Sequence, residues 1–286
     1  MIAIIVHGGA GKANSKEEIP GRIETCKYAA KTGFDILKSG GSAIDAAVEA
    51  VKIFEDDPFF NAGRGAYLNK KGEVELDSGI MDGESLKSGA ASGIKHIKNP
   101  ILLAKIIMEK SPHRFLISEG AEEFALENQL EIVPNSYFIT KEKREIYLKK
   151  LNKNQESDTV GAVALDEKGH IASAVSTGGT PFKEKGRVGD SPIIGSGFFA
   201  NNIYGAVATG IGEDIMKAVL SFRINLYINE GIEYAVQQTI DDLTKLNGKA
   251  GIIALDKRGN IAYKYNTEMM FYGFMKEGMK EPEGGI

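Results

Sequence analysis

The chain has 286 residues, of which 42% are hydrophobic and 26% charged, a composition typical of a soluble globular protein with one large domain or two small ones. Its net charge at pH 7 is −4, and no basic tract is present that could neutralise phosphates, so we expect no nucleic-acid partner. The single cysteine excludes an intramolecular disulfide, and the four histidines are too scattered to form a metal site.

The N-terminal residues predict a short buried strand followed by a glycine loop. Residues 2–6 are apolar and lack the positive charges that open a signal peptide. No run reaches the ~18 apolar residues of a membrane span, so we expect a cytoplasmic protein with no membrane partner. The loop at residues 7–11 ends the predicted strand. It is not a P-loop, since Val6 stands where glycine is required and Lys12 is followed by Ala13. It suits either close backbone approach to a ligand or a tight turn in a packed core.

Two helices and an acidic loop are predicted next. Apolar residues recur on one helical face between residues 22 and 38. Cys26 lies on that face, so we interpret it as a core residue and not as a nucleophile. Ser42 and Asp45 resemble a capping box that opens a second helix. The acidic cluster in the loop at residues 55–65 either binds a cation or is solvated.

The middle of the chain predicts short segments with polar ends. The charged stretch at residues 141–155 is helical if anything, and we expect it to be the least ordered part. The other predicted segments are strands at 73–76 and 80–83, an alternating small and polar stretch at 89–96, and helices at 100–110 and 119–129.

A sharp change in composition occurs at Thr159. The residues before it are rich in Lys, Glu and Asn, whereas Val160–Leu165 reads as a buried strand. A mobile segment that ends at a threonine is a natural place for a backbone cut, and an N-terminal threonine is a known kind of nucleophile. Taken alone, these residues favour an ordinary loop followed by a strand.

The chain after Thr159 predicts strands and helices in succession. Residues 160–175 form a predicted hairpin. A segment of similar sequence at residues 251–262 predicts a second hairpin nearby in the sheet system. We also expect a strand at 206–208 and helices at 213–229 and 232–246. This order favours sheets covered by helices in layers over a simple alternating α/β fold.

Threonine and glycine occur together at two of these strand ends. Thr177 is followed by two glycines, and Thr209–Gly212 opens a helix where backbone N–H groups could stabilise an oxyanion. Between them, Arg187 and Asp190 lie in a glycine loop and could clamp the carboxylate and ammonium of an amino acid. The ordinary alternatives are a loop salt bridge between Arg187 and Asp190 and unremarkable strand-end hydroxyls.

Taken together and in order, these phrases resemble the plant-type L-asparaginase / isoaspartyl aminopeptidase family of N-terminal nucleophile hydrolases. The resemblance extends from residue 7 to about residue 270, and its most specific phrases are Asp158–Val163 and Gly186–Pro192. The remaining matching phrases are His7–Gly11, Glu55–Pro58, Phe60–Gly63, Ile80–Gly83, Ser176–Gly179, Thr209–Glu213, and Asn266–Thr267 with Met269.

The resemblance implies an α+β fold, the four-layer αββα sandwich of that class, in a single domain spanning residues 1–286. It also implies a precursor that cuts itself between Asp158 and Thr159, leaving chains 1–158 and 159–286 associated. Such heterodimers commonly pair, so a dimer of heterodimers is expected. Many members of the family have glycine before the nucleophile, and Asp158 either slows the cut or assists it.

The resemblance also assigns roles around Thr159. Its hydroxyl would attack the side-chain amide of L-asparagine or the β-peptide bond of isoaspartyl dipeptides, with its own freed α-amine as the base. Thr209 and Gly210 would hold the oxyanion, and Thr177 would lie beside the nucleophile. Arg187 would bind the α-carboxylate of the substrate, and Asp190 would bind its α-amine. Asn61 would lie close to the same centre, and Gly212 would line the pocket.

The implied cofactor requirements are small. The loop at 54–63 resembles one that holds a structural sodium through backbone carbonyls, and no catalytic cofactor or side-chain metal site is implied. Two other functions remain open at this point. A glycosylasparaginase would use the same chemistry, although the missing signal peptide and single cysteine argue against it. An uncleaved homologue that only binds amino acids is disfavoured because all the implied catalytic residues are present.

Overall fold

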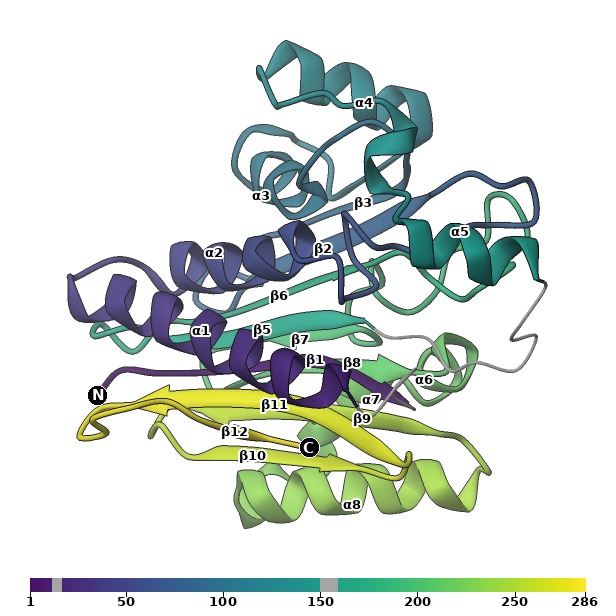
Figure 1. The fold of residues 1–286 in the computed structure, drawn as a ribbon. Helices are drawn as coiled ribbons and strands as arrows, with labels where there is room; N and C mark the ends of the chain where they lie inside the picture. Colours follow the sequence, from purple (N-terminus) through teal and green to yellow (C-terminus); the bar gives the residue numbers. More distant parts are fainter. Residues whose placement is uncertain (12–16, 150–158) are drawn as a thin grey trace.

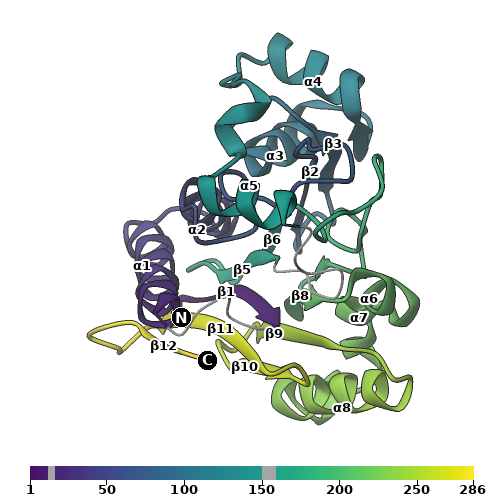
Figure 2. The same ribbon diagram turned by 45° about the vertical axis from the view of Figure 1, so that its right-hand side comes forward.

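Two β-sheets and the helices packed on them make up the protein (Figures 1 and 2). The structure is a computed structural model and describes residues 1–11, 17–149 and 159–286. The strands are β1 (Ala3–Gly11), β2 (Leu76–Asp82), β3 (Ser88–Ile94), β4 (Phe115–Ile117), β5 (Val160–Leu165), β6 (Ile171–Thr177), β7 (Phe198–Ala200), β8 (Tyr204–Gly210), β9 (Ala250–Asp256), β10 (Ile261–Tyr265), β11 (Met269–Lys276) and β12 (Glu283–Gly285). The α-helices are α1 (Glu18–Lys38), α2 (Ala43–Asp56), α3 (Pro100–Lys110), α4 (Ser118–Glu127), α5 (Lys141–Leu148), α6 (Gly212–Ala218), α7 (Leu220–Arg223) and α8 (Ile232–Lys245).

The larger sheet has the strand order β12-β11-β1-β5-β6-β2-β3-β4, and the smaller has the order β10-β9-β8-β7. Strand β5 lies in the interior of the larger sheet, antiparallel to both β1 and β6. Every residue of β5 is buried. Strand β5 is held on both sides from Gly161 onward, and Thr159 lies immediately before its first residue.

Alternation along β1 and β5 explains why both strands are apolar throughout. Ile4 and Val6 face one cluster of buried side chains, which includes residues of α1 and α2, whereas Ile5 faces another. In β5, Ala162 belongs to the first cluster and Val163 to the second. Since successive side chains of a strand point to opposite faces, both faces of the larger sheet are covered here.

The second cluster joins the two sheets. Its members include Val163 of β5, Val207 of β8 and Ile253 of β9, so the smaller sheet packs against the larger one. A third cluster joins the other face of the smaller sheet to α8, through residues such as Ile252 and Ile240. The protein is therefore a mixture of helices and strands built on two sheets, as the α+β prediction required (Figure 2).

Several predicted segments are confirmed. Helices α1, α3, α4 and α8 lie at the predicted positions within a few residues, and Cys26 is buried. The Ser42 hydroxyl accepts the Asp45 N–H and so caps α2 as expected. The two similar hairpins form β5–β6 in one sheet and β9–β10 in the sheet packed against it.

The prediction that the first strand ends before His7 is wrong. Strand β1 continues through the glycine loop to Gly11 and pairs with β11, with a shift of register between His7 and Ala10. Gly9 has a φ of 105° within this irregular stretch. A β-bulge that glycine can adopt, and not a tight turn, therefore explains the residues at 7–11.

The predicted helix at residues 213–229 is also wrong in its length. Helix α6 ends at Ala218, because Val219 adopts a left-handed conformation with φ 49° and ψ 53°. The N–H groups of Ser221 and Phe222 then bond to carbonyls of the loop at Ser196 and Gly195. These tertiary hydrogen bonds replace helical ones and divide the segment into α6, α7 and short 3-10 turns.

One other expectation needs correction. The predicted strand at 73–76 is wrong except for its last residue, because β2 begins at Leu76 and runs to Asp82 without a break, with Asp77 through Asp82 paired to β6. The charged stretch at 141–155 is helical where it is described: Lys141–Leu148 form helix α5, with Lys143 buried 4.1 Å from the centre of the Tyr67 ring. Residues 150–155 of that stretch lie outside the described residues.

In the part of the chain that the structure describes, none of the helices combines the length and apolarity required to cross a bilayer.

A buried carboxyl group at the end of α2 affects stability. Glu55 is fully buried, and its Oε1 accepts the Ile101 N–H at the start of α3 over 2.9 Å. Burial raises the pKa of Glu55 from 4.5 to about 8. The folded protein therefore holds a proton there that the unfolded chain releases, and the stability from this group falls as pH rises from about 4.5 through about 8.

We predict that Glu55→Gln removes this pH dependence, since glutamine keeps the hydrogen-bond acceptor without the charge. Between pH 5 and pH 8, the melting temperature of the wild type should fall relative to that of Glu55→Gln by several degrees, measured by calorimetry, at roughly 2–4 °C per kcal/mol. Glu49→Gln on the exposed side of α2 is the control and should track the wild type. Parallel curves for the wild type and Glu55→Gln would contradict the prediction.

Candidate active site

Three threonines meet at the start of β5. The Thr159 Oγ1 lies 3.2 Å from the Thr177 Oγ1, and the Thr159 backbone N–H donates to the Thr209 Oγ1 over 3.2 Å. Thr177 ends β6, which lies beside β5, and Thr209 lies in β8 of the facing sheet. All three are at most 2% exposed. The structure thus brings together the predicted nucleophile and two of its predicted partners.

The Thr209 hydroxyl connects three strands. Its oxygen also accepts the Ala10 N–H over 3.2 Å, and it lies 3.4 Å from the Thr159 carbonyl oxygen, to which it can donate. Gly210 follows with a φ of 137°, and a side-chain carbon built there would lie 2.7 Å from both the Ala250 Cα and the Lys249 carbonyl oxygen. Glycine is therefore required at position 210 by both conformation and space.

Arg187, Asp190 and Gly212 form a second group beside the threonines. A side-chain carbon built on Gly212 would lie 2.8 Å from the Arg187 Nη2 and 2.9 Å from the Asp190 Oδ1. The missing side chain of Gly212 therefore leaves the arginine and aspartate close to the same point. Ser191, next to Asp190, has its Oγ 3.5 Å from the Thr159 Oγ1, so the two groups adjoin.

Arg187 makes its salt bridge with Glu213. The Nε and Nη2 donate to the two carboxylate oxygens of Glu213 over 2.9 and 2.8 Å. A guanidinium group has two edges that can each bind a carboxylate with two hydrogen bonds. Glu213 occupies the Nε–Nη2 edge, and the Nη1–Nη2 edge is the one that could bind a second carboxylate.

Asp190 has the properties of a site for an ammonium group. It is 4% exposed, and its Oδ2 has no hydrogen-bond partner among the described residues. Burial raises the pKa of Asp190 from 3.8 to about 7, and the charge of Arg187 opposes this shift. A buried carboxylate oxygen without a partner is costly unless a cation joins it, so this site can bind a positive charge.

Asn61 is placed behind Thr177. Its side-chain Nδ2 donates to the Gly179 carbonyl over 2.7 Å, and its backbone carbonyl accepts the Gly178 N–H. The Gly179 N–H in turn donates to the Thr177 Oγ1 over 3.0 Å. Asn61 therefore fixes the turn that carries Thr177, as expected for a residue close to the same centre.

The sequence patterns do not single out three neighbours of Thr159. Ser191 and Glu213 occur only within larger matching segments, with no role of their own. His7 belongs to a set of scattered histidines, yet it pairs with Gly161, two residues after Thr159, across β1 and β5. Burial lowers the pKa of His7 to about 3, so the ring is neutral at physiological pH. Pairing of the predicted first strand with the strand after Thr159 was the signal that could have located it.

Some predicted features cannot be placed. Asp158, on the other side of the predicted cut, lies outside the described residues. Within the described ranges, no three His, Cys, Asp or Glu side chains group closely enough to hold a metal ion.

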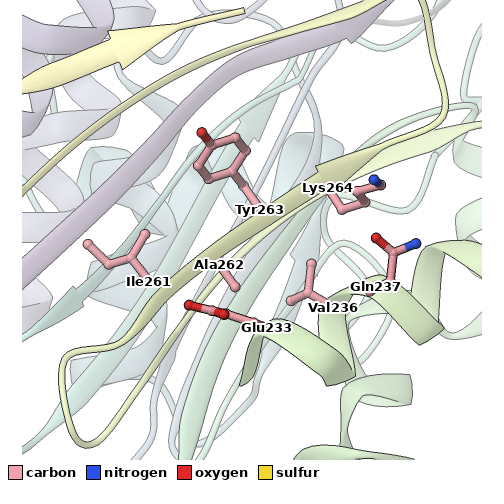
Figure 3. Close-up of a pocket in the computed structure, with 7 residues that line it drawn as sticks. All are labelled: Glu233, Val236, Gln237, Ile261, Ala262, Tyr263 and Lys264. Carbon is pink, nitrogen blue, oxygen red and sulfur yellow. The ribbon is translucent and has the colours of Figure 1, made fainter. Parts of the chain in front are cut away.

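A hollow of about 180 Å³ lies between α8 and β10, lined by residues such as Glu233, Gln237 and Lys264 (Figure 3). It contains none of the groups around Thr159. The site is therefore defined by the convergence of threonines and charged residues and not by this hollow.

Comparison with known proteins supports the resemblance. The sequence model of a family described as asparaginase matches residues 1–282. The chain is similar to the plant-type L-asparaginase of Pyrococcus furiosus, with 44% identity over the whole of both chains. It is also similar to the isoaspartyl peptidase/L-asparaginase of Bos taurus, with 42% identity over 96% of this chain and 93% of the relative.

The similarity to a plant-type L-asparaginase of Thermococcus kodakarensis is of the same degree, with 42% identity over the whole of both chains. The family match spans nearly all of the sequence and includes the three threonines and the Arg187–Gly212 group. The chain belongs to the asparaginase family.

Proposed function

We propose that the protein is an amidohydrolase that hydrolyses L-asparagine to aspartate and ammonia and also hydrolyses β-aspartyl dipeptides. The observation that carries this proposal is the meeting of Thr159, Thr177 and Thr209 beside Arg187 and Asp190. These groups combine a nucleophile with sites for the carboxylate and ammonium of an α-amino acid. The names of the relatives agree with this substrate class.

The nucleophile becomes active when the chain cuts itself before Thr159. The Thr159 hydroxyl attacks the carbonyl of Asp158, the peptide nitrogen leaves, and an ester forms that water hydrolyses. The products are chains 1–158 and 159–286, and Thr159 now carries a free α-amine. An α-amine has an ordinary pKa of about 7.7–8.0, which suits a general base near neutral pH.

Hydrolysis then uses the same hydroxyl. The α-amine of Thr159 removes the hydroxyl proton as Oγ1 attacks the side-chain carbonyl of the substrate. The Thr209 hydroxyl and the Gly210 N–H stabilise the oxyanion, and such a donor is worth roughly 3–4 kcal/mol. Ammonia or a peptide amine leaves with the proton, and water hydrolyses the aspartyl ester. Thr177, 3.2 Å from Oγ1, orients the nucleophile.

Recognition depends on the second group. The Nη1–Nη2 edge of Arg187 binds the substrate α-carboxylate while Glu213 holds the other edge. The Asp190 Oδ2, without a partner among the described residues, accepts the α-ammonium. Gly212 leaves room between the two for the substrate Cα.

The family also suggests the assembly and architecture. We infer a single domain with a four-layer αββα arrangement, cut into two chains that remain together and pair as a dimer of heterodimers. The clusters of buried side chains on both faces of both sheets support the four-layer part of this inference.

The family resemblance also implies a structural sodium ion held by backbone carbonyls of the loop at residues 54–63. In this loop the carbonyl oxygens of Pro58 and Phe60 both lie against Gly65, since a side-chain carbon built there would be 2.4 and 2.7 Å from them. Carbonyl oxygens are ligands that hard cations prefer. An ion held by carbonyls of this loop would stabilise the segment that carries Asn61.

We predict that Thr159→Ala abolishes both the cut and turnover. The variant should remain one species of 30.9 kDa in intact mass spectrometry and release no ammonia from L-asparagine. Thr267→Ala, in a loop of the C-terminal part, is the control and should behave as the wild type. A wild type that never splits and releases no ammonia would instead indicate the uncleaved binding homologue.

We predict that Arg187→Ala raises KM for L-asparagine by about 10- to 100-fold, the worth of a charge-assisted pair, and leaves the cut intact. The control is Arg223→Ala, which removes an arginine paired with Asp242 away from the threonines. Steady-state kinetics and mass spectrometry measure the two effects. Loss of the cut in Arg187→Ala would show that the arginine is needed for the architecture and not for substrate.

We predict that KM for L-asparagine rises as pH falls through about 7, since Asp190 with its raised pKa is protonated below that value and no longer attracts an ammonium. The decline of kcat on the acidic side reports the Thr159 amine separately. In Asp190→Asn, KM should be high and independent of pH between 6 and 8. A variant that keeps the wild-type pH dependence of KM would exclude Asp190 as its origin.

A further inference from the structure

A group of buried charges lies behind the loop that carries Arg187. Lys183 and Glu75 are each 4% exposed and Asp77 is 1% exposed. The Lys183 Nζ donates to the Glu75 carbonyl oxygen over 2.8 Å. The Glu75 carboxylate accepts the Gly186 N–H, immediately before Arg187, over 3.1 Å. None of the steps of the proposed hydrolysis uses these three side chains.

Lys183 contacts the turn that follows Thr177. A side-chain carbon built on Gly179 would lie 2.8 Å from the Lys183 Nζ, so the ammonium group lies directly against this glycine. The Gly179 N–H donates to the Thr177 Oγ1, and its carbonyl accepts the Asn61 Nδ2. One buried cation therefore packs against the glycine whose N–H and carbonyl bond to Thr177 and Asn61.

Asp77 provides a negative charge near this lysine. It pairs with Thr177 across β2 and β6, and its Oδ1 accepts the Gly93 N–H over 3.1 Å. The Oδ2 has no hydrogen-bond partner among the described residues. Burial raises the pKa of Asp77 and lowers that of Lys183, while each charge opposes the shift of the other. Each charge therefore offsets part of the cost of burying the other.

Burying a lysine side chain costs more free energy than burying a methionine of similar length, because the ammonium group loses its hydration. Replacing a buried charged pair with neutral side chains is often neutral or stabilising for the fold. Stability alone therefore does not explain why an ammonium group is buried against Gly179. Its contact with the turn that follows Thr177 explains it, if the ammonium group holds that turn in place.

We propose that Lys183 is a positioning residue for the hydrolysis, whose ammonium group, balanced by Asp77, fixes the Thr177–Gly179 turn relative to Thr159. The inference rests on the proposed function, because it assigns Lys183 a part in that reaction. Its effect falls on the chemical step, since Arg187, which binds the substrate carboxylate, is held separately by its salt bridge with Glu213.

The test compares Lys183→Met with Lys183→Met/Asp77→Asn, with rates normalised to the amount of cleaved chain. The single variant leaves the Asp77 charge uncompensated, so its melting temperature should fall; the double variant removes both charges and should recover it. In both variants kcat for L-asparagine should be at least 10-fold below that of the wild type, with KM within about 3-fold. Lys185→Met, on the same loop with a 57% exposed side chain, is the matched control and should keep wild-type kinetics.

Recovery of kcat together with melting temperature in the double variant would overturn the proposal, because Lys183 would then serve only to balance Asp77. A KM effect without a kcat effect would overturn it as well. An inactive wild type, or an active Thr159→Ala variant, would instead refute the proposed function. The two failures are therefore distinguishable.

A pH profile of Asp77→Asn gives a second test that does not need loss of the lysine. The charged groups that face Lys183 are Asp77 of β2, Glu75 just before β2, and Arg187 on its own loop. Without the Asp77 charge, the pKa of Lys183 falls further, so the ammonium is lost at lower pH. The alkaline limb of kcat should shift to lower pH relative to the wild type, and an unshifted limb would contradict the positioning role.

Discussion

The burial of β5 on both faces is the constraint on which the rest of the structure depends. Strands β1 and β6 bond to its two edges, α2 covers one face, and the smaller sheet covers the other. A strand enclosed in this way has no freedom to slide, because a shift of one residue would exchange its two faces. Thr159 at its start is therefore fixed relative to the ends of β6 and β8, where Thr177 and Thr209 lie.

The same enclosure determines the electrostatics of the site. Groups near Thr159 are removed from water, so burial governs the pKa values of His7 and Asp190. A neutral histidine and a carboxyl that is half protonated near pH 7 are consequences of the packing. The ion pair of Arg187 with Glu213 lies nearer the surface, where Glu213 is 59% exposed and contacts with substrate can form.

Local patterns in the sequence predicted much of this arrangement. Helices with a regular apolar face or a clear cap were placed within a few residues, and the composition change at Thr159 located the start of β5. The family resemblance selected Thr177, Thr209, Arg187 and Asp190, and the structure places them around Thr159 or adjoining it.

What the sequence did not predict depends on partners distant along the chain. Strand β1 continues through its glycines only because β11 pairs with it, and the helix after Gly212 breaks at Val219 because loop carbonyls take its N–H groups. Likewise, the pairing of Arg187 with Glu213 and the packing of Lys183 against Gly179 follow from how the loop at 178–190 folds back. Spacing along the chain carries no information on such contacts.

The hydrogen bond from the Thr159 nitrogen to Thr209 indicates why the protein would have no hydrolytic activity before the proposed cut. In the intact chain this nitrogen is an amide that donates to the Thr209 hydroxyl, and its lone pair is delocalised into the peptide bond. It cannot take up a proton, however well the surrounding side chains are arranged. The cut that we propose would change the electronic state of this one atom, from an amide nitrogen to an amine. It would thereby supply the base beside Thr177 and Thr209, which already contact Thr159 in the uncut chain.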